Sequence, residues 1–302
     1  MKEAQMKIER LDKDFERIIE PGTEIEIIQD DLIFTEGPVW NSQLNALLFS
    51  DIPANKIYTW SEKEGRTVFR ENSHYANGLT YNPAGELIAC EHQSRSVTHT
   101  KKKGEIQDVA THYQGKKLNS PNDVVATADG SIFFTDPIYG LSAGNGGPAE
   151  AELDFQGVFI SRPGADPLKP ELITDSFERP NGLAFTPDGK QLFIADTVRQ
   201  HIRAFDVADG FKCSGGCVWA ELWDDAYTGR PDGMKFDLQG NLFSTGPGGV
   251  WVFNPNADVI GRIYLPDKTS NLAWGDDGHS LYITSSPMVY RIRCKTSGQI
   301  LV

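Results

Sequence analysis

Six short motifs place an oxygen-bearing side chain at the same position each time. The six residues are Glu36, Asn77, Asn122, Asn181, Asp232 and Asn271. If the motifs meet in space, Glu36 and Asp232 with Asn122 and Asn181 form an all-oxygen set that carries two carboxylates. Ca²⁺ fits this set best because it takes hard oxygen ligands and accepts carboxamides readily. Mg²⁺, Zn²⁺ and Mn²⁺ are the alternatives, although zinc usually selects His or Cys.

Two plainer explanations of the motifs stay open at this point. Asn-Gly and Asp-Gly pairs form tight turns, so the motifs could be hairpin turns and nothing more. That explanation does not cover Glu36-Gly37 or Asn122-Asp123, which occupy the same register without being favoured turn pairs. The second explanation is a purely structural ion that holds the repeats together.

The chain between the motifs predicts the elements that position these residues. After each motif comes a short apolar run, a turn, and a second strand such as those ending at Asp51, Asp136 and Asp196. β-branched and aromatic runs bounded by Gly, Pro, Asp or Asn are typical of strands. The motifs recur at intervals of about 40 to 60 residues, close to the length of a four-stranded propeller blade. The sequence therefore predicts an all-β fold, a six-bladed β-propeller with four-stranded blades.

The two ends of the chain complete this prediction. The last repeat is too short for a good fourth strand, and residues 25–29 could supply it and so close the ring. We therefore expect one propeller domain over residues 25–302. Residues 1–24 are expected to form a short docked helix or arm, because Ile8, Leu11, Phe15 and Ile18 have roughly helical spacing.

Two intervals exceed the usual blade length and indicate long loops. Residues 137–157 contain Tyr139 and are expected to fold over one mouth of the channel, and residues 209–229 form the second loop. Loops of this length are often functional, although plain surface excursions are the alternative.

Composition narrows the classes of partner and the compartment. A net charge of -13 argues against nucleic acid or an anionic membrane as partner. No apolar run is long enough to span a membrane, and the N-terminus lacks the apolar segment of a signal peptide, so we expect a cytoplasmic protein. The 4 cysteines are too few for a disulfide scaffold. Cys213 and Cys217 could form a local disulfide or remain free thiols.

Several of these stretches together resemble a known family. They are residues 34–40, 49–53, 118–124, 134–137 and 230–233. In these stretches the chain is similar to the senescence marker protein 30 (SMP-30), gluconolactonase and luciferin-regenerating enzyme superfamily, and above all to its bacterial gluconolactonase branch. The resemblance covers nearly the whole chain after residue 24. It implies a six-bladed propeller with one catalytic divalent ion, commonly calcium, in the channel.

The resemblance also implies roles for individual residues. Glu36, Asn181 and Asp232 match the family's metal ligands, and Asn122 matches the asparagine that binds the ion or the substrate beside it. Asp123 would support this group from behind. The animal members have an arginine where Ser120 stands here. The candidates that would orient a sugar lactone in this chain are Asn77, His92, Arg95, Tyr139 and Asn271.

The implied reaction is hydrolysis of a sugar lactone, with Ca²⁺ polarising the ester carbonyl while water attacks. Asp232 is the candidate general base, and His92 could act as base or proton shuttle or be a histidine with no catalytic part. The alternatives are a hydrolase of other lactones or of phosphotriesters, and a non-enzymatic ligand-binding propeller. The expected assembly is a monomer or a homodimer.

Overall fold

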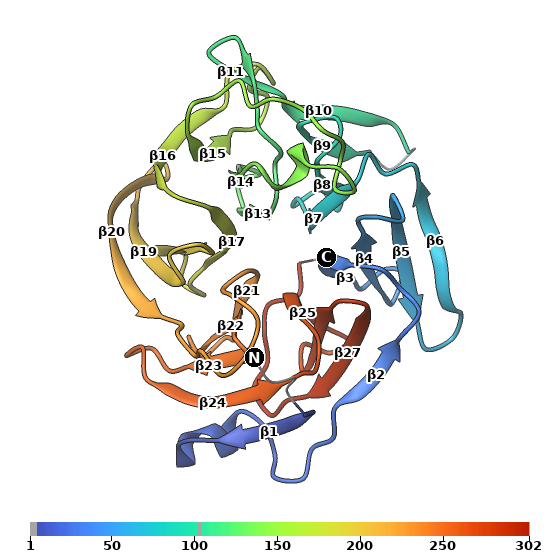
Figure 1. Cartoon of the computed structure of the whole chain (residues 1–302), viewed down its shortest axis with the longest axis vertical. Coiled ribbons are helices and arrows are strands. Elements are labelled where there is room, and N and C mark those ends of the chain that lie inside the picture. The colour runs from blue at the N-terminus through green and yellow to red at the C-terminus, as the bar shows by residue number, and fades with distance from the viewer. Residues whose placement is uncertain (1–4, 102–103, 302) are drawn as a thin grey trace.

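The computed structural model describes residues 5–101 and 104–301. Residues 1–4 of the predicted arm and residue 302 of the predicted propeller domain lie outside this part. Within it, the strands form six sheets arranged in a ring, together with one two-stranded ribbon (Figure 1). In each sheet the strand that begins near a motif lies nearest the axis (Figure 1). The prediction of a six-bladed β-propeller with four-stranded blades is therefore confirmed.

The first three blades follow the chain in order from the inner to the outer strand. Blade 1 consists of β3 (Thr35–Asn41), β4 (Ala46–Asp51), β5 (Lys56–Ser61) and β6 (Gly65–Glu71). Blade 2 consists of β7 (Ala76–Tyr81), β8 (Leu87–Glu91), β9 (Ser96–Thr100) and β10 (Ile106–Ala110). The ribbon of β11 (His112–Tyr113) and β12 (Lys116–Lys117) follows. Blade 3 consists of β13 (Val124–Ala126), β14 (Ile132–Asp136), β15 (Gln156–Ser161) and β16 (Glu171–Phe177).

The remaining blades include strands from the N-terminal segment. Blade 4 consists of β17 (Pro180–Phe185), β18 (Gln191–Asp196), β19 (His201–Ala208) and β20 (Lys212–Glu221). Blade 5 consists of β21 (Met234–Phe236), β22 (Leu242–Gly246), β23 (Gly249–Phe253) and β24 (Val259–Tyr264), and β1 (Lys7–Arg10) joins its outer edge. Blade 6 consists of β25 (Thr269–Gly275), β26 (Ser280–Ser285), β27 (Met288–Arg293) and β2 (Glu26–Gln29).

Short turns join the first and second strands of the blades. Glycines with positive φ occupy five of these turns, at positions 85, 130, 189, 240 and 278, as the sequence predicts. Blade 1 uses Asn45, with φ of 48°, at the same place. These turns lie at the end of the inner strand that is remote from the motif. The motifs themselves are therefore free to line the other end of the channel.

The ring closes where the sequence predicts, because β2 pairs with the last strand, β27, in antiparallel register. Arg291 of β27 and Glu26 of β2 form an ion pair with a nitrogen–oxygen distance of 2.6 Å. This pairing gives blade 6 its fourth strand from the opposite end of the chain. It also covers an edge that would otherwise expose unpaired backbone groups.

The segment before β2, expected to be a short docked helix or arm, is mostly an arm that packs on blade 5. Residues 7–10 are the strand β1, and the helical part is only the 3-10 helix η1 (Lys13–Arg17). The outer edge of β24 offers backbone partners to this segment, which the helical spacing of its apolar residues did not reveal. Phe15 is fully buried, and Ile18 and Ile19 join it in the core shared by blades 5 and 6.

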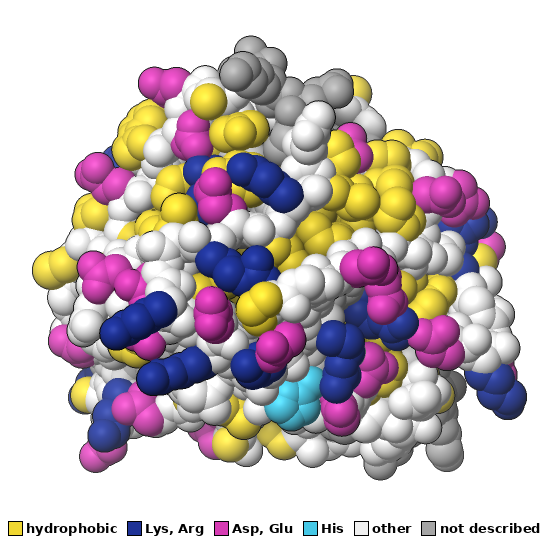
Figure 2. All heavy atoms as spheres, turned by 90° about the horizontal axis from the view of Figure 1, so that it is seen from below, with side chains coloured by type: hydrophobic (Ala, Val, Ile, Leu, Met, Phe, Trp, Pro, Cys, Tyr) yellow, Lys and Arg dark blue, Asp and Glu magenta, His cyan; other side chains and the backbone are white. Residues whose placement is uncertain are grey.

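The apolar cores lie between neighbouring blades. Trp40 of blade 1 stacks on Tyr282 of blade 6 with ring centroids 5.6 Å apart. The edge of the molecule near β1 and β2 shows acidic and basic side chains side by side, with apolar side chains among them (Figure 2). The four cysteines at positions 90, 213, 217 and 294 are free thiols. Among the described residues, no helix has the length and apolar character needed to cross a membrane.

Candidate functional site

All six motif residues are buried at the same end of the inner strands. Their side chains are 3% to 7% exposed. Four of them lie in the first residues of β3, β7, β17 and β25, and the other two precede β13 and β21 by two residues. Because these strands surround the axis (Figure 1), the motif residues of neighbouring blades meet at one end of the channel.

The glycines of the motifs serve close packing between blades. A Cβ at Gly182 would overlap the backbone oxygen of Asp232, and a Cβ at Gly233 would overlap the side chain of Asn271. The same relation links Gly37 to the backbone oxygen of Asn77. The motif residues therefore sit at the start of strands whose neighbours approach within backbone contact. The hairpin-turn explanation of the Asn-Gly and Asp-Gly pairs is wrong for this fold.

Three buried carboxylates lie close enough to influence one another. Burial raises the pKa of Glu36 well above its usual range, and the negative charges of Asp232 and Asp123 raise it further. Burial also raises the pKa of Asp232 to about 7, against the opposing effect of Lys268. The pKa of Asp123 is raised by burial as well, although Lys235 opposes this shift. Such a group of acids is stabilised in its ionised form by a cation.

Hydrogen bonds link these acids to the neighbouring carboxamides. The Asn271 Nδ2 atom donates to Glu36 Oε2 at 3.2 Å and to Asp123 Oδ2 at 3.5 Å. A side-chain hydrogen bond from Asn181 lowers the pKa of Asp232. Glu36, Asp123, Asn181, Asp232 and Asn271 therefore form one constellation, drawn from blades 1, 3, 4, 5 and 6.

The donor set can be tested for its fit to a metal ion. The Asn181 Nδ2 atom donates to Thr197 Oγ1 at 3.0 Å, whereas the Asn181 Oδ1 atom is buried and has no hydrogen-bond partner. A buried carboxamide oxygen without a partner beside two carboxylates suits a hard divalent cation. Nowhere in residues 5–101 and 104–301 do three or more His, Cys, Asp or Glu side chains form a metal-binding group. The constellation differs from such a group because asparagines supply part of its oxygens.

His92 lies against Asn77, and both of its ring nitrogens are engaged. Nε2 is 3.2 Å from Asn77 Nδ2, and Nδ1 is 2.8 Å from the carbonyl oxygen of Asn145. Nδ1 must donate to that carbonyl, so Nε2 is the acceptor and the ring is neutral. Burial lowers the pKa of His92 to about 4, which agrees with this assignment. His92 thus connects a motif residue to the loop at 137–157.

Arg95 and Ser120 also hold this part of the molecule in place. The Arg95 Nε atom donates to the carbonyl oxygens of Leu118 and Asn119 at 2.7 and 3.1 Å. Ser120 Oγ donates to the carbonyl oxygen of Pro137 at 2.5 Å and accepts from the Gly140 N–H at 2.9 Å. The structure therefore places Arg95 against backbone and gives Ser120 a role in anchoring the loop.

Tyr139 is the member of this loop that reaches the acids. The 3-10 helix η2 (Tyr139–Leu141) carries it, and the Arg179 guanidinium lies 4.9 Å from its ring centroid. Burial raises the pKa of Tyr139 to about 12, and the nearby charge of Asp232 adds to this shift. Thr197 and Arg179 act in the opposite direction.

Sequence reasoning missed three residues at this site. Thr197 accepts from Asn181 and donates to the carbonyl oxygen of Pro231 at 2.8 Å, so it joins blades 4 and 5. Arg179 and Lys268 bring positive charge towards Tyr139 and Asp232, respectively. Thr197 follows the second strand of its blade and Arg179 precedes a motif, so their positions were visible. Thr197 has no threonine at the equivalent place in the other blades. Arg179 has a counterpart in Arg230, which precedes Asp232 in the same way, but an arginine in two of six motifs gave no reason to choose it.

Comparison with known proteins agrees with this geometry. The family described as the SMP-30/gluconolactonase/LRE-like region matches residues 34–287. The chain is 32% identical to a gluconolactonase of Zymomonas mobilis, over 97% of this chain and 87% of that protein. It is 24% identical to a pentonolactonase of Haloferax volcanii, over 83% and 81% of the two chains. It is 26% identical to human regucalcin over 82% of each.

Solved structures extend the likeness to three dimensions. A gluconolactonase from Xanthomonas campestris superposes with a TM-score of 0.89 at 29% identity, over 96% of both chains. The family region begins at Phe34, next to the start of β3, and ends at Pro287, next to the start of β27. On this agreement of sequence and architecture, the chain belongs to the SMP-30/gluconolactonase/LRE-like family.

Proposed function

We propose that the protein is a calcium-dependent lactonase that opens a sugar lactone of the glucono-1,5-lactone type. The observation that carries this proposal is the pair of buried carboxylates, Glu36 and Asp232, beside the unpartnered oxygen of Asn181. The gluconolactonase and pentonolactonase relatives support the class of substrate. A divalent ion is supported by the likeness in fold to a regucalcin of Agrobacterium tumefaciens that is described as a calcium-binding protein.

Glu36, Asn181 and Asp232 would hold the ion, with Asn122 as a fourth ligand or as a contact to the substrate. When bound there, Ca²⁺ would supply a Lewis acid for the ester carbonyl oxygen. The hard-oxygen set favours Ca²⁺ over Mg²⁺, which demands stricter geometry, and over Zn²⁺, which usually selects His or Cys, whereas none of these four residues is His or Cys. Mn²⁺ is the remaining alternative.

The protein's own groups divide the remaining work. Asp232 is the proposed general base, because its carboxylate would lie beside the water that attacks at the metal site. Its pKa of about 7 belongs to the metal-free protein, and a bound Ca²⁺ would lower it. Tyr139 and the Arg179 guanidinium, which lies 4.9 Å from the centroid of the Tyr139 ring, would contact sugar hydroxyls. Asn77 and Asn271 would make further contacts to the substrate.

His92 fits a positioning role better than that of a base. Both ring nitrogens are already hydrogen-bonded, and a pKa of about 4 leaves the ring a weak proton acceptor. The ring fixes the carboxamide of Asn77 and the loop carbonyl at Asn145. Arg95 is proposed to act in the same way, by holding the backbone that leads to Asn122, and not through contact with substrate.

A substrate panel tests this proposal. Hydrolysis of glucono-1,5-lactone, other sugar lactones, simple lactones and a phosphotriester is measured with EDTA-treated protein and after Ca²⁺ is restored. We expect activity on sugar lactones that EDTA abolishes and Ca²⁺ restores. Asp232→Ala should lower kcat/KM about 10²-fold or more and weaken Ca²⁺ binding. Asp237→Asn serves as the control, because this buried acid lies at the other end of β21.

Each rival reading has its own outcome in this panel. Activity that is indifferent to EDTA refutes the metal mechanism. Preference for the phosphotriester or for simple lactones reassigns the substrate while keeping the site. No hydrolysis at all, with ligand binding that Asp232→Ala leaves intact, indicates a binding propeller. A cytoplasmic location and a monomeric or homodimeric state stay predictions from the sequence.

A further inference from the structure

Three buried aspartates occupy equivalent places in three blades. Asp51, Asp136 and Asp196 are the last residues of β4, β14 and β18, the second strands of blades 1, 3 and 4. They are 2%, 0% and 0% exposed. The reaction proposed above uses none of them. Each lies 14 or 15 residues after a proposed metal ligand, namely Glu36, Asn122 and Asn181.

These carboxylates accept backbone N–H groups from the chain that leads into the ligand. Asp51 accepts from Ile33 at 3.1 Å and from Phe34 at 3.2 Å. Asp196 accepts from Glu178 at 2.8 Å and from Arg179 at 3.1 Å. In both blades the two donors are the residues three and two positions before the ligand.

Blade 3 repeats the arrangement with one bond fewer. Asp136 Oδ2 accepts from the N–H of Asn119, three positions before Asn122, at 2.7 Å. Asn119 Nδ2 in turn donates to the carbonyl oxygen of Asp136 at 3.0 Å. The second carboxylate oxygen, Asp136 Oδ1, is buried without a hydrogen-bond partner.

The chain between the pinned residues and each ligand is short and stiff. Pro121 and Pro180 directly precede Asn122 and Asn181, and proline fixes φ. In blade 1 the corresponding residue is Thr35, which is fully buried and donates to the carbonyl oxygen of Met288 at 2.9 Å. Fixing the backbone two or three residues upstream therefore fixes where the ligand side chain begins.

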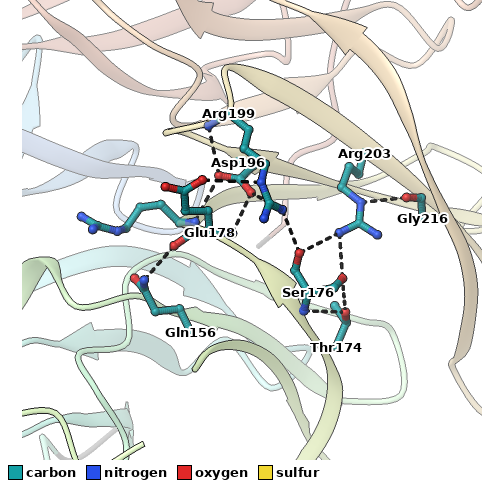
Figure 3. A network of polar contacts seen from close by, with 9 residues as sticks. Gln156, Thr174, Ser176, Glu178, Asp196, Arg199, Arg203 and Gly216 are labelled. Carbon is teal, nitrogen blue, oxygen red and sulfur yellow. Dashed lines mark hydrogen bonds and ion pairs between the residues drawn. The ribbon is translucent and has the colours of Figure 1, made fainter. Parts of the chain in front are cut away.

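Figure 3 shows the Asp196 carboxylate of blade 4 and the polar residues around it. The Arg199 Nη1 atom lies 3.4 Å from Oδ2 of the Asp196 carboxylate. The carbonyl oxygen of Glu178 accepts from Gln156 Nε2 of blade 3 at 2.7 Å. The residue three positions before Asn181 is therefore held through both its N–H and its carbonyl group.

The other blades lack this arrangement within the described residues. Blade 2 has Glu91 at the equivalent place, and its longer side chain binds the side chains of Arg70, His74, Ser94 and Thr98. Blades 5 and 6 have Gly246 and Ser285 there. The buried aspartates therefore occur in the three blades that carry Glu36, Asn122 and Asn181, three of the four proposed metal ligands. The fourth, Asp232, has its N–H held by Thr245 Oγ1 at 2.9 Å.

We propose that Asp51, Asp136 and Asp196 are positioning residues for the metal site, each setting the backbone from which one ligand projects. This inference rests on the metal site proposed above. Charge-assisted hydrogen bonds to backbone N–H groups are stronger than neutral ones. An Asp→Asn change keeps the shape but removes the charge and turns one acceptor oxygen into a donor that faces an N–H group.

Calcium affinity of the folded protein tests the proposal. Isothermal calorimetry on EDTA-stripped protein is run at a temperature where circular dichroism shows every variant to be folded. Asp51→Asn and Asp196→Asn should raise the Kd for Ca²⁺ about 10- to 100-fold, the usual effect of losing a group that orients a ligand. Asp136→Asn should raise it less, because only one of its oxygens accepts a backbone N–H.

Asp237→Asn is the matched control. Asp237 is fully buried and accepts the N–H groups of Gln239 and Asn241 at 3.0 and 2.8 Å, but at the far end of β21. It should lower the melting temperature while leaving the Kd unchanged. Gln156→Ala is the milder second variant, should Asp196→Asn not fold. It frees the carbonyl of Glu178 and should raise the Kd several-fold.

Three results are decisive against the proposal. The proposal is overturned if Asp51→Asn and Asp196→Asn bind Ca²⁺ with the Kd of the parent protein. If Asp196→Asn does not fold and Gln156→Ala replaces it, a Kd of Gln156→Ala equal to that of the parent overturns the proposal as well. An equal loss of affinity in Asp237→Asn overturns it too, since the effect would then follow stability alone. A parent protein that binds no Ca²⁺ refutes the metal site itself, and this is seen before any variant is compared.

Discussion

The burial of Asp232 predicts how the stability of the metal-free protein depends on pH. Asp232 has a pKa of about 7 in the folded protein and close to 3.8 when unfolded. Between these values the folded state holds a proton that the unfolded chain has lost. The free energy of unfolding must therefore fall as the pH rises from 4 to 7 and stay level above 7, as far as this group is concerned.

The structure sets the size of this effect. One pKa unit corresponds to about 1.36 kcal/mol, so a shift of this extent corresponds to about 4 kcal/mol. Solvent screening does little to reduce it, because the side chain is only 7% exposed. Asn at position 232 carries no charge at any pH. The variant Asp232→Asn should therefore gain about 4 kcal/mol over the parent protein between pH 4 and pH 7.

Urea denaturation of EDTA-stripped protein at several pH values measures this difference. Subtracting parent from variant removes the contributions of acids that the two proteins share and that do not interact with Asp232. Saturating Ca²⁺ should abolish the loss of stability, since the ion binds the deprotonated acids. Calorimetry in buffers of different ionisation enthalpy should show that Ca²⁺ binding near pH 6 releases protons from Asp232 and from Glu36, whose pKa is also raised, and that fewer protons are released at pH 8.5. A difference between parent and variant that does not change with pH refutes the reasoning.

Three further predictions concern Phe15 in the apolar core, Gly182 between two inner strands, and His92. Phe15→Ala should lower the free energy of unfolding by about 3–5 kcal/mol in urea titrations, with lactonase kcat at 25 °C unchanged, because Phe15 is fully buried far from the channel. Gly182→Ala should weaken Ca²⁺ binding about tenfold or more in calorimetry, because its Cβ would displace the backbone of Asp232. Gly164→Ala is the control for lost stability alone, because its Cβ would meet no atom within 4 Å while its φ of 72° strains an alanine there, and it should leave Ca²⁺ binding unchanged. His92→Gln should lower kcat but leave the ionisations of the pH–rate profile in place between pH 5.5 and 8, because burial keeps the pKa of His92 at about 4; loss of one ionisation in that range would instead make His92 the base.

The repeat made most of the fold predictable. The six motifs and five glycine turns recur because every blade meets the same geometric demands, and a single sequence displays that recurrence. Ring closure by residues 25–29 followed from the shortness of the last repeat. The strand β1 was not predictable in the same way. Its partner β24 lies some 250 residues away, and the spacing of Ile8, Leu11, Phe15 and Ile18 carries no record of that pairing.

The site was predictable only where it follows the repeat. Glu36, Asn181, Asp232 and Asn271 meet because each starts an inner strand. Arg95 does not join them, since its left-handed backbone, with φ of 58°, turns the chain between β8 and β9 of blade 2 and its guanidinium binds carbonyl groups. Sequence could not show this, because the direction of a side chain in a turn depends on one backbone angle.

The motif joins its polar residue to glycine for a reason that concerns the width of the channel. The Gly78 N–H donates to the carbonyl oxygen of Asn122 at 2.8 Å, and the Gly233 N–H donates to that of Ser270 at 2.7 Å, each across to the next blade. Such contact requires that no Cβ stands between neighbouring inner strands. Without glycine the strands must move apart and the ring must widen. A wider ring would separate Glu36 from Asp232, so the glycine that permits close packing also sets the spacing on which any shared ion depends.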